Sequence, residues 1–185
     1  AACAASSNRD CIIPPGVYVF NSQPNCISSN IHLFGGGGSD AVELKRNYNG
    51  TGNKGLVCIE AGGGGTTVEN LVILAAAGTS SGSMLSIIAT TTTQISSVVL
   101  KDLRLTTLGS CTNNYSLYVD GTGATSAPIG VRDLAMSNVV TFGAVNASQA
   151  FWGVVGLTSV GTANYQAGCA TESVGLIIGG TAGVP

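Results

Sequence analysis

The side chains that could act on a ligand are few in this chain and lie mainly in two short apolar stretches. Glu60 and Asp120 each end an alternating stretch, LVCIE at residues 56–60 and SLYVD at residues 116–120. Alternation in a strand puts Tyr118 and Asp120 on one face, and the same offset exposes Cys58 and Glu60. Carboxylates accept hydrogen bonds from sugar hydroxyls, and neighbouring aromatic rings stack on sugar rings. With Trp152 from a later stretch, Tyr118, Asp120 and Glu60 form the candidate ligand-binding set.

Other familiar kinds of active site are poorly represented. His32 is the only histidine and lies in an alternating stretch, which predicts an outward-facing surface residue and argues against a Ser/His/Asp or Cys/His triad. The six cysteines show no C-x-x-C spacing, and the nine acidic residues are too scattered for a calcium site. The glycine run at residues 62–65 lacks the Lys-Ser/Thr of a P-loop. The sequence therefore predicts no metal and no cofactor.

Charge and hydropathy exclude two classes of partner. The formal net charge is −2, so the chain has no basic surface of the kind that a phosphate backbone requires, and nucleic acid is not expected to bind. Mean hydropathy is +0.38, but the apolar runs are far shorter than the roughly 18–20 residues of a membrane-spanning helix. Membrane insertion is therefore not expected either.

A repeated pattern predicts the elements that position these residues. Three segments, starting at Val68, Leu100 and Val131, read apolar, charged, Asn or Asp, Leu, any residue, apolar. A second family of apolar stretches lies between and after them, at residues 56–60, 84–89, 116–120, 151–155 and 174–178. Their short length, their Val, Ile, Leu and Thr content and their Gly, Ser and Asn borders are typical of strands.

A unit of about 30 residues with two or three short strands buries its apolar face only against copies of itself. The pattern therefore predicts an all-β fold, a single-stranded parallel β-helix of about five coils, in which Leu71, Leu103 and Leu134 stand in file. A β-sandwich or jelly roll is the alternative. We expect one domain over residues 1–185, with an N-terminal extension (1–10), an entry coil (11–35) and stacked coils (36–180).

The opening of the chain resembles a known family. The segments IIPPGVYVF at residues 12–20 and SSNIHLFG at residues 28–35 resemble the first coil of pectin-lyase-like right-handed β-helices, in which a Pro-x-Gly-x-Tyr strand leads to an Asn-x-x-Leu-x-Gly strand. Bacteriophage tail spikes and tail fibres have this opening most often, followed by pectate lyases and polygalacturonases. The resemblance implies that the predicted β-helix is right-handed, and it implies a homotrimer located in a virion tail or outside the cell.

In that family the rung Asn stacks at a bend, a column that Asn70, Asp102 and Asp133 would fill here. Asp102 and Asp133 on neighbouring coils would repel each other. The residues before the bend would face outward in a second column, made of Glu69, Lys101 and Arg132. Glu69 over Lys101 predicts an ion pair between coils, and this column is either a solvated face or a small basic spot for an acidic sugar.

Three functions remain open. The first is a tail spike or fibre segment that recognises host cell-surface polysaccharide without catalysis. The second is a polysaccharide lyase or glycoside hydrolase with Glu60 and Asp120 as acid and base, since residues two coils apart stand about 10 Å from each other, close to the spacing of an inverting glycosidase. The third is a self-assembling extracellular or virion structural protein.

The cysteines bear on the compartment. An extracellular protein could pair Cys3, Cys11 and Cys26 among themselves, and Cys11 and Cys26 flank one strand and its return, which favours at least one disulfide. A protein assembled in a reducing cytosol would leave all six as small buried apolar residues.

Overall fold

All regular structure in the described part of this protein is β-strand. The computed structural model describes residues 9–38, 40–51, 54–60, 62–76, 79, 81–89, 95–106, 114–120, 131–132, 134–142, 148–157, 164–167 and 177–179. No helix occurs within these ranges, and most of the strand pairs are parallel. The expected all-β class is therefore confirmed. The described residues include no helix with the length and apolar character needed to cross a membrane.

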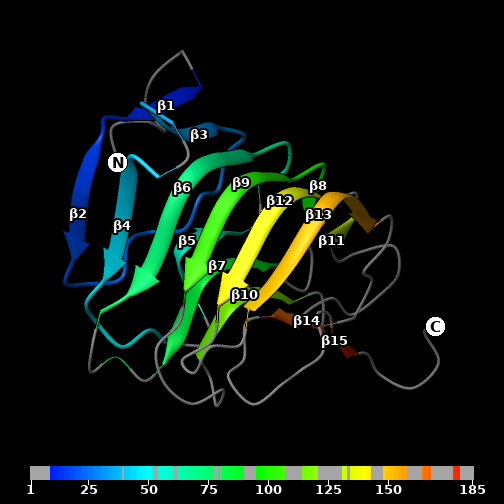
Figure 1. Cartoon of the computed structure of the whole chain (residues 1–185). Helices are drawn as coiled ribbons and strands as arrows, with labels where there is room; N and C mark the ends of the chain where they lie inside the picture. The colour runs from blue at the N-terminus through cyan, green and yellow to red at the C-terminus, as the bar shows by residue number, and fades with distance from the viewer. Residues whose placement is uncertain are drawn as a thin grey trace.

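The strands form two large sheets and one small one (Figure 1). The front sheet has eight strands: β1 (Asp10–Ile13), β2 (Gly16–Phe20), β3 (His32–Gly35), β4 (Val42–Arg46), β6 (Thr67–Ala75), β9 (Val99–Thr106), β12 (Leu134–Phe142) and β13 (Ser148–Leu157). The back sheet has five: β5 (Gly55–Ile59), β7 (Gly82–Ile88), β10 (Asn114–Asp120), β14 (Asn164–Ala167) and β15 (Ile177–Gly179). The short strands β8 (Ile95–Ser96) and β11 (Val131–Arg132) pair with each other.

The chain alternates between the two large sheets, as the two strand families predict. It passes from β4 to β5, from β6 to β7 and from β9 to β10, each time from the front sheet to the back sheet. Alternating residues of β6, including Val68, Leu71 and Ile73, are buried between the sheets. A parallel strand needs a long connection before it returns beside its predecessor, and the excursion through the opposite sheet supplies that connection.

Residues about thirty positions apart become lateral neighbours. Leu71 lies beside Leu103 in the pairing of β6 with β9, and both are fully buried. The third member of the file is Val139, however, because β12 pairs with β9 through Val139 and Leu103. The prediction for Leu134 is wrong in this respect. The pattern matched Val131 and Arg132, but these residues form the separate strand β11.

A column of left-handed residues bends the long strands of the front sheet. Asn70, Asp102 and Asn138 have φ angles of 56°, 50° and 52°, and the registers place them side by side. Asn and Asp tolerate this conformation better than other non-glycine residues. The expected column therefore exists with Asn138 as its third member, while Asp133 lies outside the described residues. Asp102 thus has an amide on each side in place of a second carboxylate.

The last strands depart from the parallel pattern. The sequence assigns residues 151–155 to the second strand family, but β13 pairs antiparallel with β12 in the front sheet. Only five residues separate Phe142 from Ser148, which is a hairpin length too short for a parallel crossover. In the back sheet, β14 pairs antiparallel with both β10 and β15.

The backbone at the bend leaves no room for a side chain at Gly35. A Cβ on Gly35 would overlap the backbone carbonyl oxygen of Asn70, whereas the nearest atom to a Cβ on Gly36 lies at 3.4 Å. We expect Gly35→Ala to lower the free energy of unfolding by about 3 kcal/mol, because backbone must move, and Gly36→Ala to cost well under about 1 kcal/mol. Urea unfolding of both variants measures this difference, and equal midpoints would contradict the close approach.

Candidate functional site

The predicted ligand-binding residue Tyr118 is buried. It is 5% exposed, and its ring stacks on Tyr115 with centroids 5.3 Å apart. Its neighbours in the file across the back sheet, Cys58 and Ser86, are buried as well, at 2% and 0% exposure. Alternation correctly places Leu117 and Val119 on the opposite face of β10, but this face of the back sheet is also covered. Tyr118 therefore offers no open ring to a sugar, and that prediction is wrong.

Cys58 and Glu60 are committed to other partners. Cys58 forms a disulfide with Cys26, and the carboxylate of Glu60 forms an ion pair with Lys54 Nζ at 2.5 Å. Cys58 was expected to be exposed, and this too is wrong, because the segment before β3 crosses over it. The sulfurs of Cys26 and Cys58 lie near a carboxylate oxygen of Glu60, at distances that would suit a metal site. The two sulfurs are bonded to each other, however, so neither is available as a thiolate ligand.

The spacing expected for Glu60 and Asp120 agrees with the backbone register. Ile59 lies beside Ile87, and Ile87 lies beside Val119, so the two acids follow the same row two strands apart. At about 4.8 Å per strand, their backbones stand about 10 Å from each other. The side chain of Asp120 lies outside the described residues. The ion pair to Lys54 occupies Glu60, which makes it a poor general acid or base in this arrangement.

The strands that carry Trp152 and Tyr118 belong to different sheets. Trp152 lies in β13 of the front sheet, whereas Tyr118 lies in β10 of the back sheet. The four residues predicted to bind a ligand are therefore not brought together. The failure follows from the hairpin at β12 and β13, which sends this apolar segment back along the front sheet.

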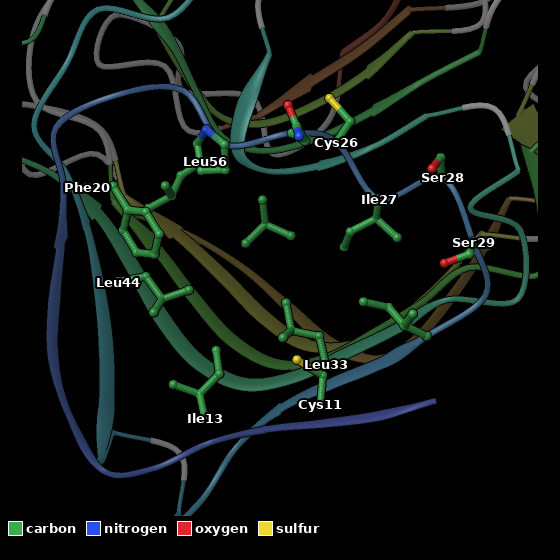
Figure 2. A pocket seen from close by; sticks show the side chains of 14 residues that line it. Cys11, Ile13, Phe20, Cys26, Ile27, Ser28, Ser29, Leu33, Leu44 and Leu56 are labelled. Atoms are coloured by element: carbon green, nitrogen blue, oxygen red, sulfur yellow. The ribbon is translucent and has the colours of Figure 1, made fainter. Parts of the chain in front are cut away.

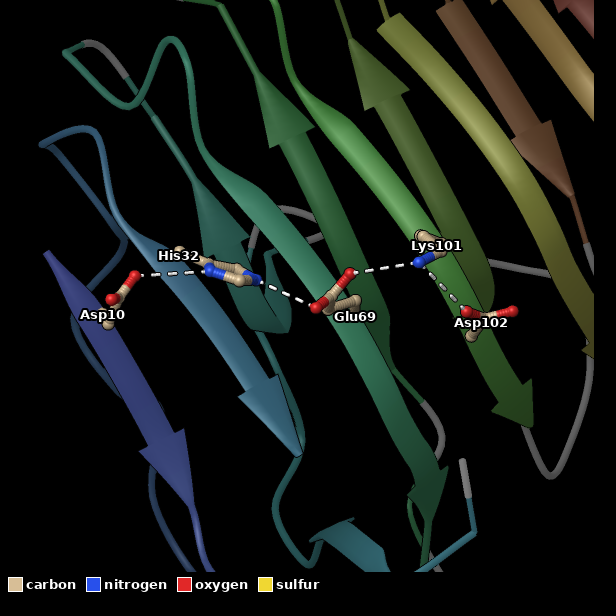
Figure 3. Close-up of polar contacts among 5 residues, drawn as sticks. All are labelled: Asp10, His32, Glu69, Lys101 and Asp102. Atoms are coloured by element: carbon tan, nitrogen blue, oxygen red, sulfur yellow. Dashed lines mark hydrogen bonds and ion pairs between the residues drawn. The ribbon is translucent and has the colours of Figure 1, made fainter. Parts of the chain in front are cut away.

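The densest polar cluster of the described residues lies instead on the front sheet. This charged row consists of Asp10, His32, Glu69, Lys101 and Asp102, which come from β1, β3, β6 and β9 (Figure 3). His32 bridges two acids, with Nδ1 at 3.3 Å from Asp10 Oδ1 and Nε2 at 3.1 Å from Glu69 Oε1. Lys101 Nζ lies 3.7 Å from both Glu69 Oε2 and Asp102 Oδ2.

Two further contacts adjoin the row, one polar and one aromatic. The amide of Asn138 donates to Asp102 Oδ1 at 2.7 Å, which extends the row to β12. The ring of His32 stacks on Phe34 with centroids 4.7 Å apart. The predicted ion pair between Glu69 and Lys101 is confirmed. The basic spot is not, because Ser137 stands beside Lys101 where Arg132 was expected.

The internal contacts of the row limit its chemistry. Both oxygens of Glu69 already have partners, one on His32 and the other on Lys101. A general base needs a lone pair that faces its substrate, and a nucleophile needs an open approach. All five side chains remain partly exposed, however. The row is thus suited to hydrogen bonding along a surface ligand and poorly suited to proton transfer.

The sequence identified only part of this row. Glu69 and Lys101 were found because both precede the left-handed column, and Asp102 was found as a member of that column. Asp10 falls in the predicted N-terminal extension, and His32 was placed only on the surface. Asp10 and His32 are paired in register, and His32 reaches Glu69 diagonally across to the next strand. The missing signal was the pairing of β1 with β3, which no repeat in the sequence marks.

The described cysteines are all in disulfides. Cys26 pairs with Cys58 over a separation of 32 residues, so the expected pairing of Cys26 with Cys3 or Cys11 is wrong. Cys11 is also disulfide-bonded, with a partner outside the described residues. The prediction of at least one disulfide is confirmed, and the bond from Cys26 to Cys58 ties the first crossing segment to the back sheet.

An apolar cavity of about 410 Å³ lies at the β1 and β2 end of the stack (Figure 2). Ile13, Phe20, Leu33, Leu44 and Leu56 line it, and Figure 2 shows the chain winding around them. None of its lining residues carries a charge. The cavity is the open end of the core between the two sheets, and its polar lining is limited to uncharged side chains such as Asn25, Ser28 and Ser29.

A buried arginine and tyrosine form a second polar site at the end of β4. Arg46 is fully buried and its Nη1 donates to the carbonyl oxygens of Tyr48 and Ser81. Burial lowers the pKa of the Arg46 guanidinium and raises the pKa of Tyr48 to about 12. The two groups pack as a cation over a ring, 5.9 Å from the guanidinium carbon to the centroid. This pair fixes the corner where the chain leaves the front sheet.

Comparison with known proteins gives no relative. No protein-family model, no curated protein and no solved structure matches the chain.

We expect the disulfide between Cys26 and Cys58 to contribute strongly to the free energy of unfolding. Replacing Cys26 and Cys58 together by alanine frees a loop of about thirty residues in the unfolded chain, and we expect a loss of about 3 kcal/mol of unfolding free energy. Urea unfolding without reductant measures the loss while the bond of Cys11 stays in place. A change below about 1 kcal/mol would show that the crossing segment is held by packing alone.

We expect the folded protein to lose stability at high pH because of Tyr48. Its pKa is about 12 in the folded protein against 10.0 for an ordinary tyrosine, so the folded state holds the proton more tightly. The resulting stability is complete below pH 10 and is lost as the pH rises through 12. Tyr48→Phe removes a hydroxyl that has no hydrogen-bond partner among the described residues. Thermal unfolding of the variant should match the wild type at pH 8 and exceed it at pH 11, and equal alkaline losses would exclude Tyr48 as the cause.

Proposed function

We propose that this chain is a segment of a bacteriophage tail spike or tail fibre that binds a host cell-surface polysaccharide without cleaving it. The binding surface is the outer face of the front sheet, and the charged row is its centre. The observation that carries the proposal is this row, in which partly exposed donors and acceptors alternate across four strands on one open sheet face.

The fold on which the proposal depends is a right-handed parallel β-helix of about five coils. Three features support it: the parallel registers between strands about thirty residues apart, the alternation between front and back sheets, and the left-handed column at Asn70, Asp102 and Asn138. The short third sheet of β8 and β11 agrees with a coil of three faces. The resemblance of residues 12–20 and 28–35 to the first coil of pectin-lyase-like proteins points the same way.

The chemistry of the row favours an uncharged or mixed-charge glycan. Carboxylates accept hydrogen bonds from sugar hydroxyls, and Lys101 donates to sugar oxygens. His32 holds Asp10 and Glu69 in place, since each of its ring nitrogens already contacts one of these acids. The row has three acids against one lysine and one histidine, so an acidic polysaccharide would meet repulsion at most positions. The stacked rings of His32 and Phe34 provide an apolar platform beside the row.

A polysaccharide lyase or hydrolase is the alternative. It is favoured by the separation of about 10 Å between the backbones of Glu60 and Asp120. The ion pair from Glu60 to Lys54 and the burial of Tyr118 oppose it. Reducing-end and unsaturated-uronate assays on a glycan panel test it directly, since any activity must disappear in Glu60→Gln.

The resemblance extends the proposal to assembly and location, namely a homotrimer in a virion tail or outside the cell. The disulfide between Cys26 and Cys58 supports an oxidising compartment, because cytosolic proteins rarely keep structural disulfides. A self-assembling extracellular or virion structural protein would share this location, and it would bind no glycan.

A glycan array tests the binding function with variants in the row. We expect the wild type to bind at least one neutral polysaccharide, and Glu69→Gln and Lys101→Ala to weaken that binding by about tenfold or more, because hydrogen bonds to charged groups contribute about 1.5–3 kcal/mol each. Binding that is absent in the wild type, or unchanged in both variants, would reject the row as the site.

The matched control is Glu43→Gln. Glu43 lies on the same sheet face in β4 and forms an ion pair with Lys45 at 3.1 Å, outside the charged row. Its substitution removes the same charge and the same kind of ion pair, so it should leave glycan binding within about twofold of the wild type. An equal loss in Glu43→Gln would show a general effect of net charge.

A further inference from the structure

The described residues leave one end of the core open at the start of the chain. Ile13, Phe20 and Ile27 pack against the core but stay partly exposed, and they line the apolar cavity of about 410 Å³ (Figure 2). Ile27 forms a parallel bridge with Ile59 of β5, which is fully buried. No strand among the described residues covers Ile27 from its other side. Because apolar surface is costly to leave in water, this end of the core needs a cover.

A disulfide shows that another segment lies against this cavity. Cys11 lines the cavity and is disulfide-bonded to a cysteine outside the described residues. Two of the other cysteines are bonded to each other, which leaves Cys3, Cys111 and Cys169 as partners for Cys11. The Cα atoms of two disulfide-bonded cysteines lie within about 7 Å of each other. The segment that carries the second cysteine therefore runs directly beside the cavity.

Position along the stack of strands favours Cys3 as the partner of Cys11. Strand β1 is the end strand of the front sheet, and β3, β6 and β9 follow it in order. Cys111 follows β9 in the chain, and Cys169 follows β14, which lies one strand beyond β10 in the back sheet. Either residue would have to return across at least three strand spacings, about 14 Å, to reach Cys11. Cys3 lies eight positions before Cys11 and needs no such return.

We infer that residues 1–8 form a cap over the cavity and that a disulfide from Cys3 to Cys11 holds the cap in place. The segment reads AACAASSN, so four alanines flank Cys3 and no side chain is charged. Alanine loses no rotamer freedom when it is buried, which makes it a suitable cover for an apolar opening. Eight extended residues span about 26 Å. That length exceeds the spacing of about 10 Å between packed sheets, so the segment can cross the opening.

The cap fits the oxidising compartment that the bond from Cys26 to Cys58 supports. Formation of the bond from Cys3 to Cys11 joins the two sulfurs and releases two protons and two electrons, which a disulfide oxidant accepts by thiol–disulfide exchange. The cap lies over the end of the core, whereas the charged row lies on the outer face of the front sheet. The inference therefore stands without glycan binding. It concerns contacts within one copy and is compatible with a homotrimer.

Disulfide mapping of the whole unreduced chain tests the bond without any variant. Trypsin cuts after Arg9 and chymotrypsin after Phe20, which places each of the first three cysteines on its own peptide. We expect mass spectrometry to find residues 1–9 linked to the peptide that holds Cys11, and denaturing electrophoresis without reductant to show a single chain of 18.4 kDa. A bond from Cys11 to a later cysteine, or to a second copy, would overturn the inference.

Binding of the dye anilinonaphthalene sulfonate, which fluoresces on exposed apolar surface, tests whether the segment covers the cavity. We expect weak fluorescence from the wild type and at least about threefold more from the double variant Ala4→Asp, Ala5→Asp, because buried carboxylates would lift the cap. The double variant Ser6→Asp, Ser7→Asp is the matched control, since it adds the same charges to the polar half of the segment, and it should match the wild type. Strong fluorescence from the wild type, no rise in the alanine variant, or an equal rise in the control would overturn the cap.

Discussion

The parallel backbone pairing of β6 with β9 is the interaction on which the rest of this structure depends. It brings Leu71 beside Leu103 in the core and Glu69 beside Lys101 on the surface, so one register fixes both the packing and the charged row. The left-handed residues Asn70 and Asp102 maintain this register through the bend, because both strands turn at the same level. A slip of one residue would send the leucines to solvent and the charged side chains into the core.

The parts of the fold that follow from this repetition could be predicted from the sequence. Strands β5, β6, β7, β9 and β10 were found because their apolar alternation and glycine borders recur about every thirty residues. The third repeat was misplaced by five residues, since Val131 and Arg132 imitate the start of a rung and Asn138 carries no neighbouring charge to mark it. Strand β13 was assigned to the wrong sheet because periodicity does not report the direction of a strand.

The candidate site was harder to predict because alternation distinguishes two faces but does not say which face is open. Tyr118 lies on the predicted face of β10, yet that face is covered, as the burial of Cys58 and Ser86 in the same file shows. The partner of Cys58 could not be read from sequence either, because Cys26 approaches it through the fold over 32 residues. Likewise, Asp10 joins the charged row only through the pairing of β1 with β3.

The difference between the two sheets explains why surface chemistry gathers on the front sheet. In the back sheet β5 is buried along its whole length and β7 is buried except at its last residue, so polar side chains there must be small or paired, such as Ser86, which accepts from the amide of Gly55. In the front sheet β4 and β6 alternate between buried and partly exposed positions, which leaves one face for charged side chains. That same open face ends at β2, where the charges stop and valines replace them.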